Sequence, residues 1–170
     1  MNRLKIFVFA IALTACASLP AAGQAPTTIL LVRHAERAGE PTDRDPELSE
    51  AGRQRAAELA RVLGDANITA IYSTPLIRTQ KTAVPLAEKL GLEITITPVT
   101  RTFIQDLATT LRSQHAGETV LVVGHSNTVP QTITALGVPL DNLEEHEYDW
   151  LFVVTLVDGH ASLTKLRFGR

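Results

Sequence analysis

Cysteine and aromatic residues are scarce in this sequence, and neither sign of charge prevails. Cys16 is the only cysteine among 170 residues, aromatic residues make up 5%, and the formal net charge is -2. A single cysteine excludes an intramolecular disulfide. A chain without a strong basic excess does not fit a nucleic-acid-binding protein, whose recognition surface is basic. The 45% of hydrophobic residues can fill one ordinary core, so this length predicts a single globular domain.

The first residues have the pattern of an export signal. Arg3 and Lys5 precede a nearly unbroken apolar run, 6–15, which is too short to span a bilayer. The run ends in Leu13-Thr14-Ala15-Cys16, which resembles the bacterial lipobox, where the signal is cut just before a cysteine that receives the lipid. We therefore expect residues 1–15 to be a signal peptide.

Cys16 then has two alternative fates. It becomes the lipidated start of a tether, 16–27, or ordinary secretory cleavage within 15–23 discards it with the signal. Both alternatives predict an exported protein, in the periplasm of a bacterial envelope. Removal of residues 1–15 takes away two basic residues and no acidic one, so membrane attachment requires acyl chains on Cys16.

Short apolar runs alternate with helical patterns from residue 28 onward. The patterns predict strands at 28–32, 68–72, 93–97 and 119–123, and helices at 49–63, 75–90 and 102–115. Ser49 is the expected N-cap of the first helix and Gly91 the C-cap of the second. Pro85 should kink or split the second helix.

The end of the chain has a hairpin signal. Residues 150–157 and 162–168 alternate or are apolar, and they flank Asp158-Gly159, a dipeptide typical of a tight β-turn. Strands that alternate with helices favour a mostly parallel sheet. We therefore expect residues 28–170 to form an α/β domain, a three-layer sandwich with a late antiparallel hairpin.

Three polar clusters directly follow predicted strands. They are Arg33-His34-Ala35-Glu36, the segment 73–78, and Gly124-His125-Ser126-Asn127. In a parallel sheet such strand ends lie on one edge, where ligands of these folds bind. The three clusters should therefore meet in one pocket, although they are far apart in the sequence.

The contents of this pocket suit a phosphoryl group. Arg33 and Arg78 can each offer forked donors to phosphate oxygens, and Gly124 lets the backbone approach closely. His34 and His125 add a nucleophile and a further donor. A nucleophilic imidazole must be unprotonated, whereas a donor imidazole beside a dianion is driven toward its charged form. The two histidines must therefore hold different protonation states.

These clusters resemble the motifs of the histidine phosphatase, or phosphoglycerate mutase-like, superfamily. Residues 31–36 match its strand followed by Arg-His-Gly/Ala, residues 73–79 match its Ser-Pro-x-x-Arg-Thr-type segment, and residues 123–126 match its second Gly-His. The motifs occur in the right order, and the likeness covers residues 28 to about 157. The resemblance implies a phosphoglycerate mutase-like fold.

The resemblance also implies a mechanism. His34 would attack phosphorus to form a phosphohistidine, and Arg33, Arg78 and His125 would hold the equatorial oxygens, with Asn127 as an added donor. Water would then release the phosphate. The implied activity is hydrolysis of small phosphomonoesters, with no metal and no organic cofactor, because protein cations neutralise the charge.

The acid that protonates the leaving group is less clearly matched. One branch of the superfamily has Asp directly after the second histidine, where this chain has Ser126. The mutase branch has a glutamate after the third strand, where this chain offers Asp106. Asp106 is therefore the expected general acid and Glu36 the alternative, although some small members manage without one. The acidic run 144–147 is expected to be a solvated loop, and its place after the last helical segment offers the alternative of a position near the pocket mouth.

Three other functions stay open at this point. A phosphomutase would use the same nucleophile but return the phosphate to a substrate. A binding module would hold phosphorylated ligands without turnover. A metal hydrolase would use His34, His125 and a carboxylate, although their spacing matches no familiar zinc pattern.

Overall fold

The computed structural model describes residues 25–40 and 42–169. The expected signal peptide, Cys16 and residues 16–24 of the expected tether lie outside this part of the chain. The described residues form six strands, β1 (Thr27–Arg33), β2 (Ile68–Ser73), β3 (Ile94–Ile96), β4 (Thr119–Gly124), β5 (Trp150–Val157) and β6 (His160–Arg167). They also form four helices, α1 (Glu50–Leu63), α2 (Ile77–Leu90), α3 (Phe103–Gln114) and α4 (Thr128–Ala135).

The six strands form one sheet in the order β3-β2-β4-β1-β5-β6. The first three pairings along this order, β3 with β2, β2 with β4 and β4 with β1, are parallel. β5 runs antiparallel to β1, and β6 pairs antiparallel with β5. The expected mostly parallel sheet with a late antiparallel hairpin is therefore confirmed.

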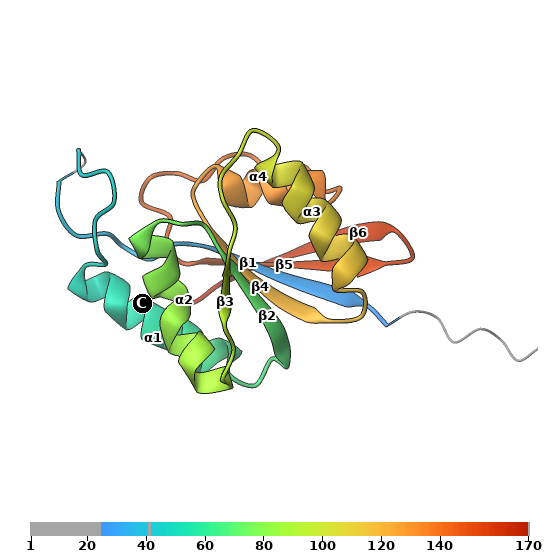
Figure 1. The fold of residues 1–170 in the computed structure, drawn as a ribbon, viewed down its shortest axis with the longest axis horizontal. Coiled ribbons are helices and arrows are strands. Elements are labelled where there is room, and N and C mark those ends of the chain that lie inside the picture. The colour runs from blue at the N-terminus through green and yellow to red at the C-terminus, as the bar shows by residue number, and fades with distance from the viewer. Residues whose placement is uncertain (1–24, 41, 170) are drawn as a thin grey trace, which may run out of the picture.

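The helices cover both faces of this sheet (Figure 1). Along β1, Ile29 and Leu31 pack with residues of α3 and α4, whereas Leu30 and Val32 pack with residues of α1 and α2. Because successive strand residues face opposite sides, an unbroken apolar strand requires a cover on each side. The result is the expected three-layer sandwich.

Local signals at the ends of elements fold as predicted. The Ser49 hydroxyl accepts a hydrogen bond from the backbone N–H of Gly52 and so caps α1. Gly91 ends α2 as its left-handed C-cap. Asp158 and Gly159 both have positive φ, 49° and 80°, as a two-residue hairpin turn between β5 and β6 requires.

Two helices differ from the prediction. α2 runs through Pro85 as one helix; the neighbouring Ala83 and Leu86 are fully buried, and the carbonyl freed by the proline belongs to exposed Lys81, where water can bind it. α4 was not predicted, because its sequence, with three threonines, Val129 and Ile133 among eight residues, has low helix propensity. Its burial against the sheet outweighs this preference. None of the helices in the described ranges is long and apolar enough to cross a membrane.

From the central position of β4 we predict how two substitutions change the stability of the fold. Leu121→Ala should lower the free energy of unfolding by about 2 to 5 kcal/mol, because the fully buried side chain would leave a cavity. Urea denaturation measures this change. In the matched control Leu166→Ala, a side chain on β6 that is 46% exposed is shortened, and the change should stay near about 0.5 kcal/mol. Equal losses would contradict the placement of β4.

Candidate active site

The ends of β1 and β4 bring the two sequence-predicted histidines together. Arg33 pairs with Gly124 in the parallel register, and the next residue, His34, donates its backbone N–H to the carbonyl of Gly124 at 2.9 Å. His125 follows Gly124 directly. The rings of His34 and His125 consequently lie with their centroids 5.4 Å apart.

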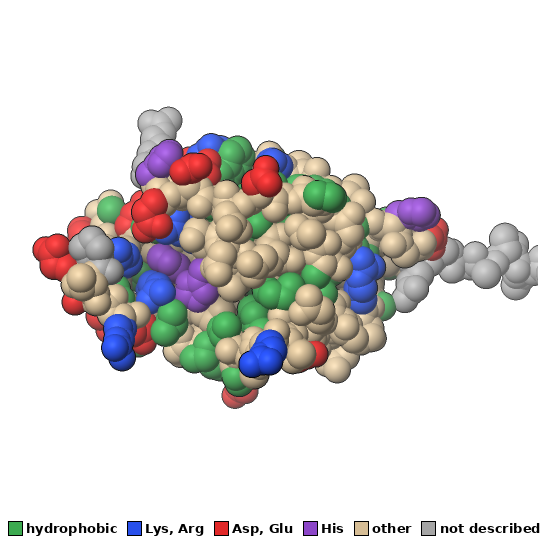
Figure 2. Space-filling model, turned by 90° about the horizontal axis from the view of Figure 1, so that it is seen from above, with side chains coloured by type: hydrophobic (Ala, Val, Ile, Leu, Met, Phe, Trp, Pro, Cys, Tyr) green, Lys and Arg blue, Asp and Glu red, His purple; other side chains and the backbone are tan. Residues whose placement is uncertain are grey.

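A polar cleft of about 310 Å³ opens over these rings. On the face drawn in Figure 2, histidine side chains lie side by side with basic and acidic side chains around them. The cleft is at the lower end of the size range of ligand pockets. Its lining comes from the ends of β1 and β4, the first turn of α2 and two loops: Arg33, His34, Arg37, Asp43, Arg78, His125, Ser126, Asn127 and Glu145.

His34 is held in the tautomer that a nucleophile needs. Its Nδ1 lies 2.8 Å from the backbone oxygen of Ala35, and because a carbonyl can only accept, Nδ1 carries the hydrogen. Nε2 therefore keeps its lone pair. Burial, reinforced by the positive charges of His125, Arg33 and Arg78 and only partly offset by the Ala35 bond, lowers the pKa of His34 to about 3. The ring is neutral at physiological pH.

His125 is also neutral in the free protein. Burial, with the charges of Arg78 and Arg33, lowers its pKa to about 4, and its Nε2 lies 2.9 Å from the hydroxyl of Thr74. The expected difference in protonation between the two histidines therefore needs a bound anion. A dianion in the cleft would raise the pKa of His125 and favour its charged, donating form.

Arg33 is anchored by the acidic loop 144–147, which lies at the cleft, the alternative to a solvated loop for this run. Its Nη1 donates to the backbone oxygens of Glu144 and Glu145, each at 2.9 Å, and of Glu147 at 3.4 Å. The guanidinium also lies over the ring of Tyr148, 4.1 Å from its centroid. The loop therefore fixes Arg33 through Nη1, and Nη2 lies 3.4 Å from both the Tyr148 hydroxyl and the Glu145 carboxylate.

Arg78 is held from a second loop. Its Nη1 donates to the backbone oxygen of Arg44 at 3.3 Å and lies 3.6 Å from the Asp45 carboxylate. The same carboxylate oxygen accepts the backbone N–H of Ile77, at 2.8 Å, where α2 begins. Among the residues that the structure describes, the Nε atoms of Arg33 and Arg78 are the buried side-chain polar atoms without a partner. Two such donors in one cleft suit an anion.

Gly124 is required by close packing below the site. A Cβ atom there would lie 2.8 Å from the hydroxyl of Thr128 and 3.1 Å from the side chain of Val129. That hydroxyl accepts the backbone N–H of His125 at 2.9 Å. The glycine thus lets α4 start directly against β4 and hold His125 in place.

The geometry and the sequence agree with one known family. The model of the histidine phosphatase superfamily (branch 1) matches residues 29–103. Over these residues the chain is similar to the histidine phosphatase superfamily.

One curated relative and two solved structures are also similar to this chain. Phosphoserine phosphatase 1 of Hydrogenobacter thermophilus is 44% identical over 71 residues, 39% of this chain and 34% of the relative, so the chain matches about a third of that protein's length. The protein histidine phosphatase SixA complexed with tungstate has a TM-score of 0.68 at 18% identity and covers 82% of this chain and 96% of its own. Phosphoserine phosphatase from Entamoeba histolytica, in complex with 3-phosphoglyceric acid, has a TM-score of 0.60 at 20% identity and covers 85% and 97%. These two similarities show the fold.

The two sequence-predicted acids, Asp106 and Glu36, lie outside the cleft. Asp106 is exposed on α3, and its carboxylate accepts the hydroxyl of Thr102 at 2.7 Å. Glu36 is bound by Arg55 through both carboxylate oxygens. Burial raises the pKa of Glu36, but the bonds to Arg55 and its charge lower it by more, so the group stays ionised. Neither carboxyl group is placed to protonate a leaving group in the cleft.

The other predicted site residues, Arg33, His34, Arg78, His125 and Asn127, all line the cleft. Ser126 lines the cleft with the rest of its predicted cluster, and Glu145 lies there as the alternative for the acidic run allowed; sequence reasoning missed Arg37 and Asp43. Arg37 and Asp43 follow His34 within ten positions, which is the one signal that could have found them. In the ranges 25–40 and 42–169, no three histidine, cysteine, aspartate or glutamate side chains group as a metal site would require.

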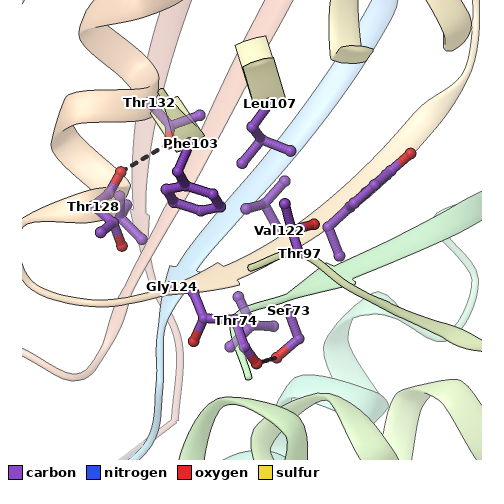
Figure 3. A pocket seen from close by; sticks show the side chains of 12 residues that line it. Ser73, Thr74, Thr97, Phe103, Leu107, Val122, Gly124, Thr128 and Thr132 are labelled. Atoms are coloured by element: carbon purple, nitrogen blue, oxygen red, sulfur yellow. Dashed lines mark hydrogen bonds between the residues drawn. The ribbon is translucent and has the colours of Figure 1, made fainter. Parts of the chain in front are cut away.

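A second cavity lies beside the end of β4 (Figure 3). Phe103 and Leu107 of α3 and Thr128 and Thr132 of α4 lie around it, and its volume is about 10 Å³. That is about the space of one water molecule. Its lining contains no arginine or histidine, so the cleft over His34 is the candidate active site.

The buried neutral histidines make stability depend on pH. An unfolded chain binds protons on these residues below about pH 6.5, whereas the folded pKa values are about 3 and about 4. The free energy of unfolding should therefore fall with decreasing pH, each histidine adding a slope of about 1.4 kcal/mol per pH unit between roughly pH 6 and 5.

Urea denaturation across this pH range measures the slope. His125→Gln should reduce it by the share of one histidine, and His160→Gln, at the exposed start of β6, should leave it unchanged. A slope in His125→Gln as steep as that of the wild-type protein would contradict the buried neutral state of that ring.

Proposed function

We propose that this protein is a phosphatase that hydrolyses phosphomonoesters through a phosphohistidine on His34. One observation carries the proposal: the imidazole of His34 presents an unprotonated Nε2 in a cleft that it shares with Arg33, Arg78 and His125. A neutral nucleophile among fixed cations is the arrangement that attack on a phosphate dianion requires.

The cations have distinct roles in this proposal. Arg33 and Arg78 hold two phosphoryl oxygens through donors that are pre-positioned by the loops around them. His125 takes up a proton beside the dianion and donates to an oxygen. Asn127, at the start of α4, supplies a further donor from its side chain. Together they stabilise the charge that spreads over the equatorial oxygens in the transition state.

The reaction then has two halves. In the first, Nε2 of His34 bonds to phosphorus as the bond to the leaving oxygen breaks, and that oxygen gains a proton to become an alcohol. In the second, water attacks the phosphohistidine, and inorganic phosphate and free His34 are restored. The protein's own cations neutralise the phosphate, so the proposal needs no metal and no organic cofactor.

The substrate class that we propose is a small phosphorylated metabolite. The cleft of about 310 Å³ admits a phosphoryl group with a small remainder. The names of similar proteins support this size class, since they include phosphoserine phosphatases, one of them in complex with 3-phosphoglyceric acid.

The test of this function is chelator-resistant turnover that depends on His34. The purified protein should hydrolyse p-nitrophenyl phosphate with EDTA present, and His34→Ala should lose at least about a thousandfold in kcat. His160→Ala, at the exposed start of β6, is the matched control and should retain full activity.

Other outcomes would select the other functions. Activity that EDTA abolishes would favour a metal hydrolase. Transfer of phosphate to a sugar hydroxyl in place of water would favour a mutase. Binding of phosphate to the intact protein without turnover would favour a binding module.

The proposed location is the periplasmic side of a bacterial envelope membrane, with an acyl anchor on Cys16. The support is the sequence pattern of residues 1–16. Bacteria that express the protein should incorporate radiolabelled palmitate into it, and Cys16→Ser should abolish the label. A mature protein that begins after Cys16 would contradict the anchor and favour ordinary secretion.

A further inference from the structure

The leaving oxygen needs a proton donor, and the carboxylates that line the cleft are the candidates. Asp106 and Glu36 are engaged elsewhere by Thr102 and Arg55. Of the described residues, only Asp43 and Glu145 bring carboxylates to the lining of the cleft. A proton donor built from a carboxyl group must therefore be one of these two.

Asp43 is committed to the structure of its loop. Its Oδ2 accepts the backbone N–H of Glu40 at 3.0 Å. The same oxygen packs against Gly39 so closely that a Cβ atom there would lie 2.1 Å away. This carboxylate closes a turn, and moving it toward a substrate would leave the N–H of Glu40 unpaired.

Glu145 has a fixed backbone and a free side chain. Its carbonyl oxygen accepts Nη1 of Arg33 at 2.9 Å, so the backbone is tied to the floor of the cleft. Its carboxylate lies 3.4 Å from Nη2 of the same arginine, and the side chain is 77% exposed. Among the described residues, Arg33 is the ion-pair partner of this carboxylate. Glu145 thus reaches from the phosphate-binding arginine to the mouth of the cleft.

The side chain of Glu145 lies at the mouth of the cleft, where a leaving group would depart. His34 is 4% exposed at the base of the cleft, so a leaving oxygen in line with the attacking nitrogen points outward, toward the mouth. We propose that Glu145 is the proton donor to that oxygen. The inference rests on the proposed phosphatase function and adds a residue to it.

Glu145 gives up one proton in the first half of the reaction and regains one in the second. As the bond from Nε2 of His34 to phosphorus forms and the ester P–O bond breaks, the carboxyl proton of Glu145 passes to the leaving oxygen and an alcohol departs. The carboxylate of Glu145 then takes a proton from the attacking water, so phosphate is released and the carboxyl group is restored.

Leaving-group dependence distinguishes a proton donor from a structural residue. An alkyl phosphate such as phosphoserine needs a proton on its departing oxygen, whereas nitrophenolate leaves without one. Glu145→Gln should therefore lower kcat/KM for phosphoserine by about a hundredfold or more, and for p-nitrophenyl phosphate by less than about threefold. kcat/KM is the proper quantity because it reports the steps up to phosphoryl transfer to His34.

Two variants serve as controls. Glu144→Gln changes the neighbouring acid on the same loop, which does not line the cleft, and should leave both substrates unaffected. Asp43→Asn should lower the two rates equally or not at all. Equal losses on both substrates in Glu145→Gln, no loss on either, or a selective loss in Asp43→Asn in its place would overturn the assignment. Failure of the wild-type protein to hydrolyse p-nitrophenyl phosphate would instead overturn the phosphatase function itself.

Discussion

The hydrogen bond from Nδ1 of His34 to the carbonyl of Ala35 is the interaction on which the site depends. A backbone carbonyl cannot donate, so this contact decides which ring nitrogen keeps its lone pair. Ala35 is itself held, because its N–H donates to the hydroxyl of Thr82 on α2 at 2.9 Å. The cations of the cleft add to the effect by opposing protonation of the ring. A nucleophile is thereby kept neutral beside the groups that attract its target.

The sequence allowed the centre of this site to be predicted, because its parts follow strands directly. β1, β2 and β4 are apolar runs with clear ends, and parallel pairing brings Arg33, Ser73 and Gly124 to one edge. Once the strands are recognised, the meeting of His34 and His125 follows from topology. Caps and turns such as Ser49 and Asp158 were predictable for the same reason, since each depends on a few neighbouring residues.

The surroundings of the site could not be predicted, because they depend on contacts between distant loops. Nothing in the sequence of the acidic run 144–147 shows that its carbonyls bind Arg33, more than a hundred positions earlier. Asp106 fits a family pattern by position, yet α3 turns it to solvent. The helix α4 forms because Val129 and Ile133 are buried against the sheet, which outweighs weak local propensity. In each case, contacts with residues distant in the sequence determine the local structure.

The most direct test of the account is to trap the phosphorylated protein during turnover and find the modified atom. A rapid quench with substrate in excess, followed by peptide mass spectrometry, should place an acid-labile, alkali-stable phosphate on Nε2 of His34. Phosphate on any other residue, or a protein that turns over substrate without ever carrying phosphate, would contradict a neutral His34 as the nucleophile.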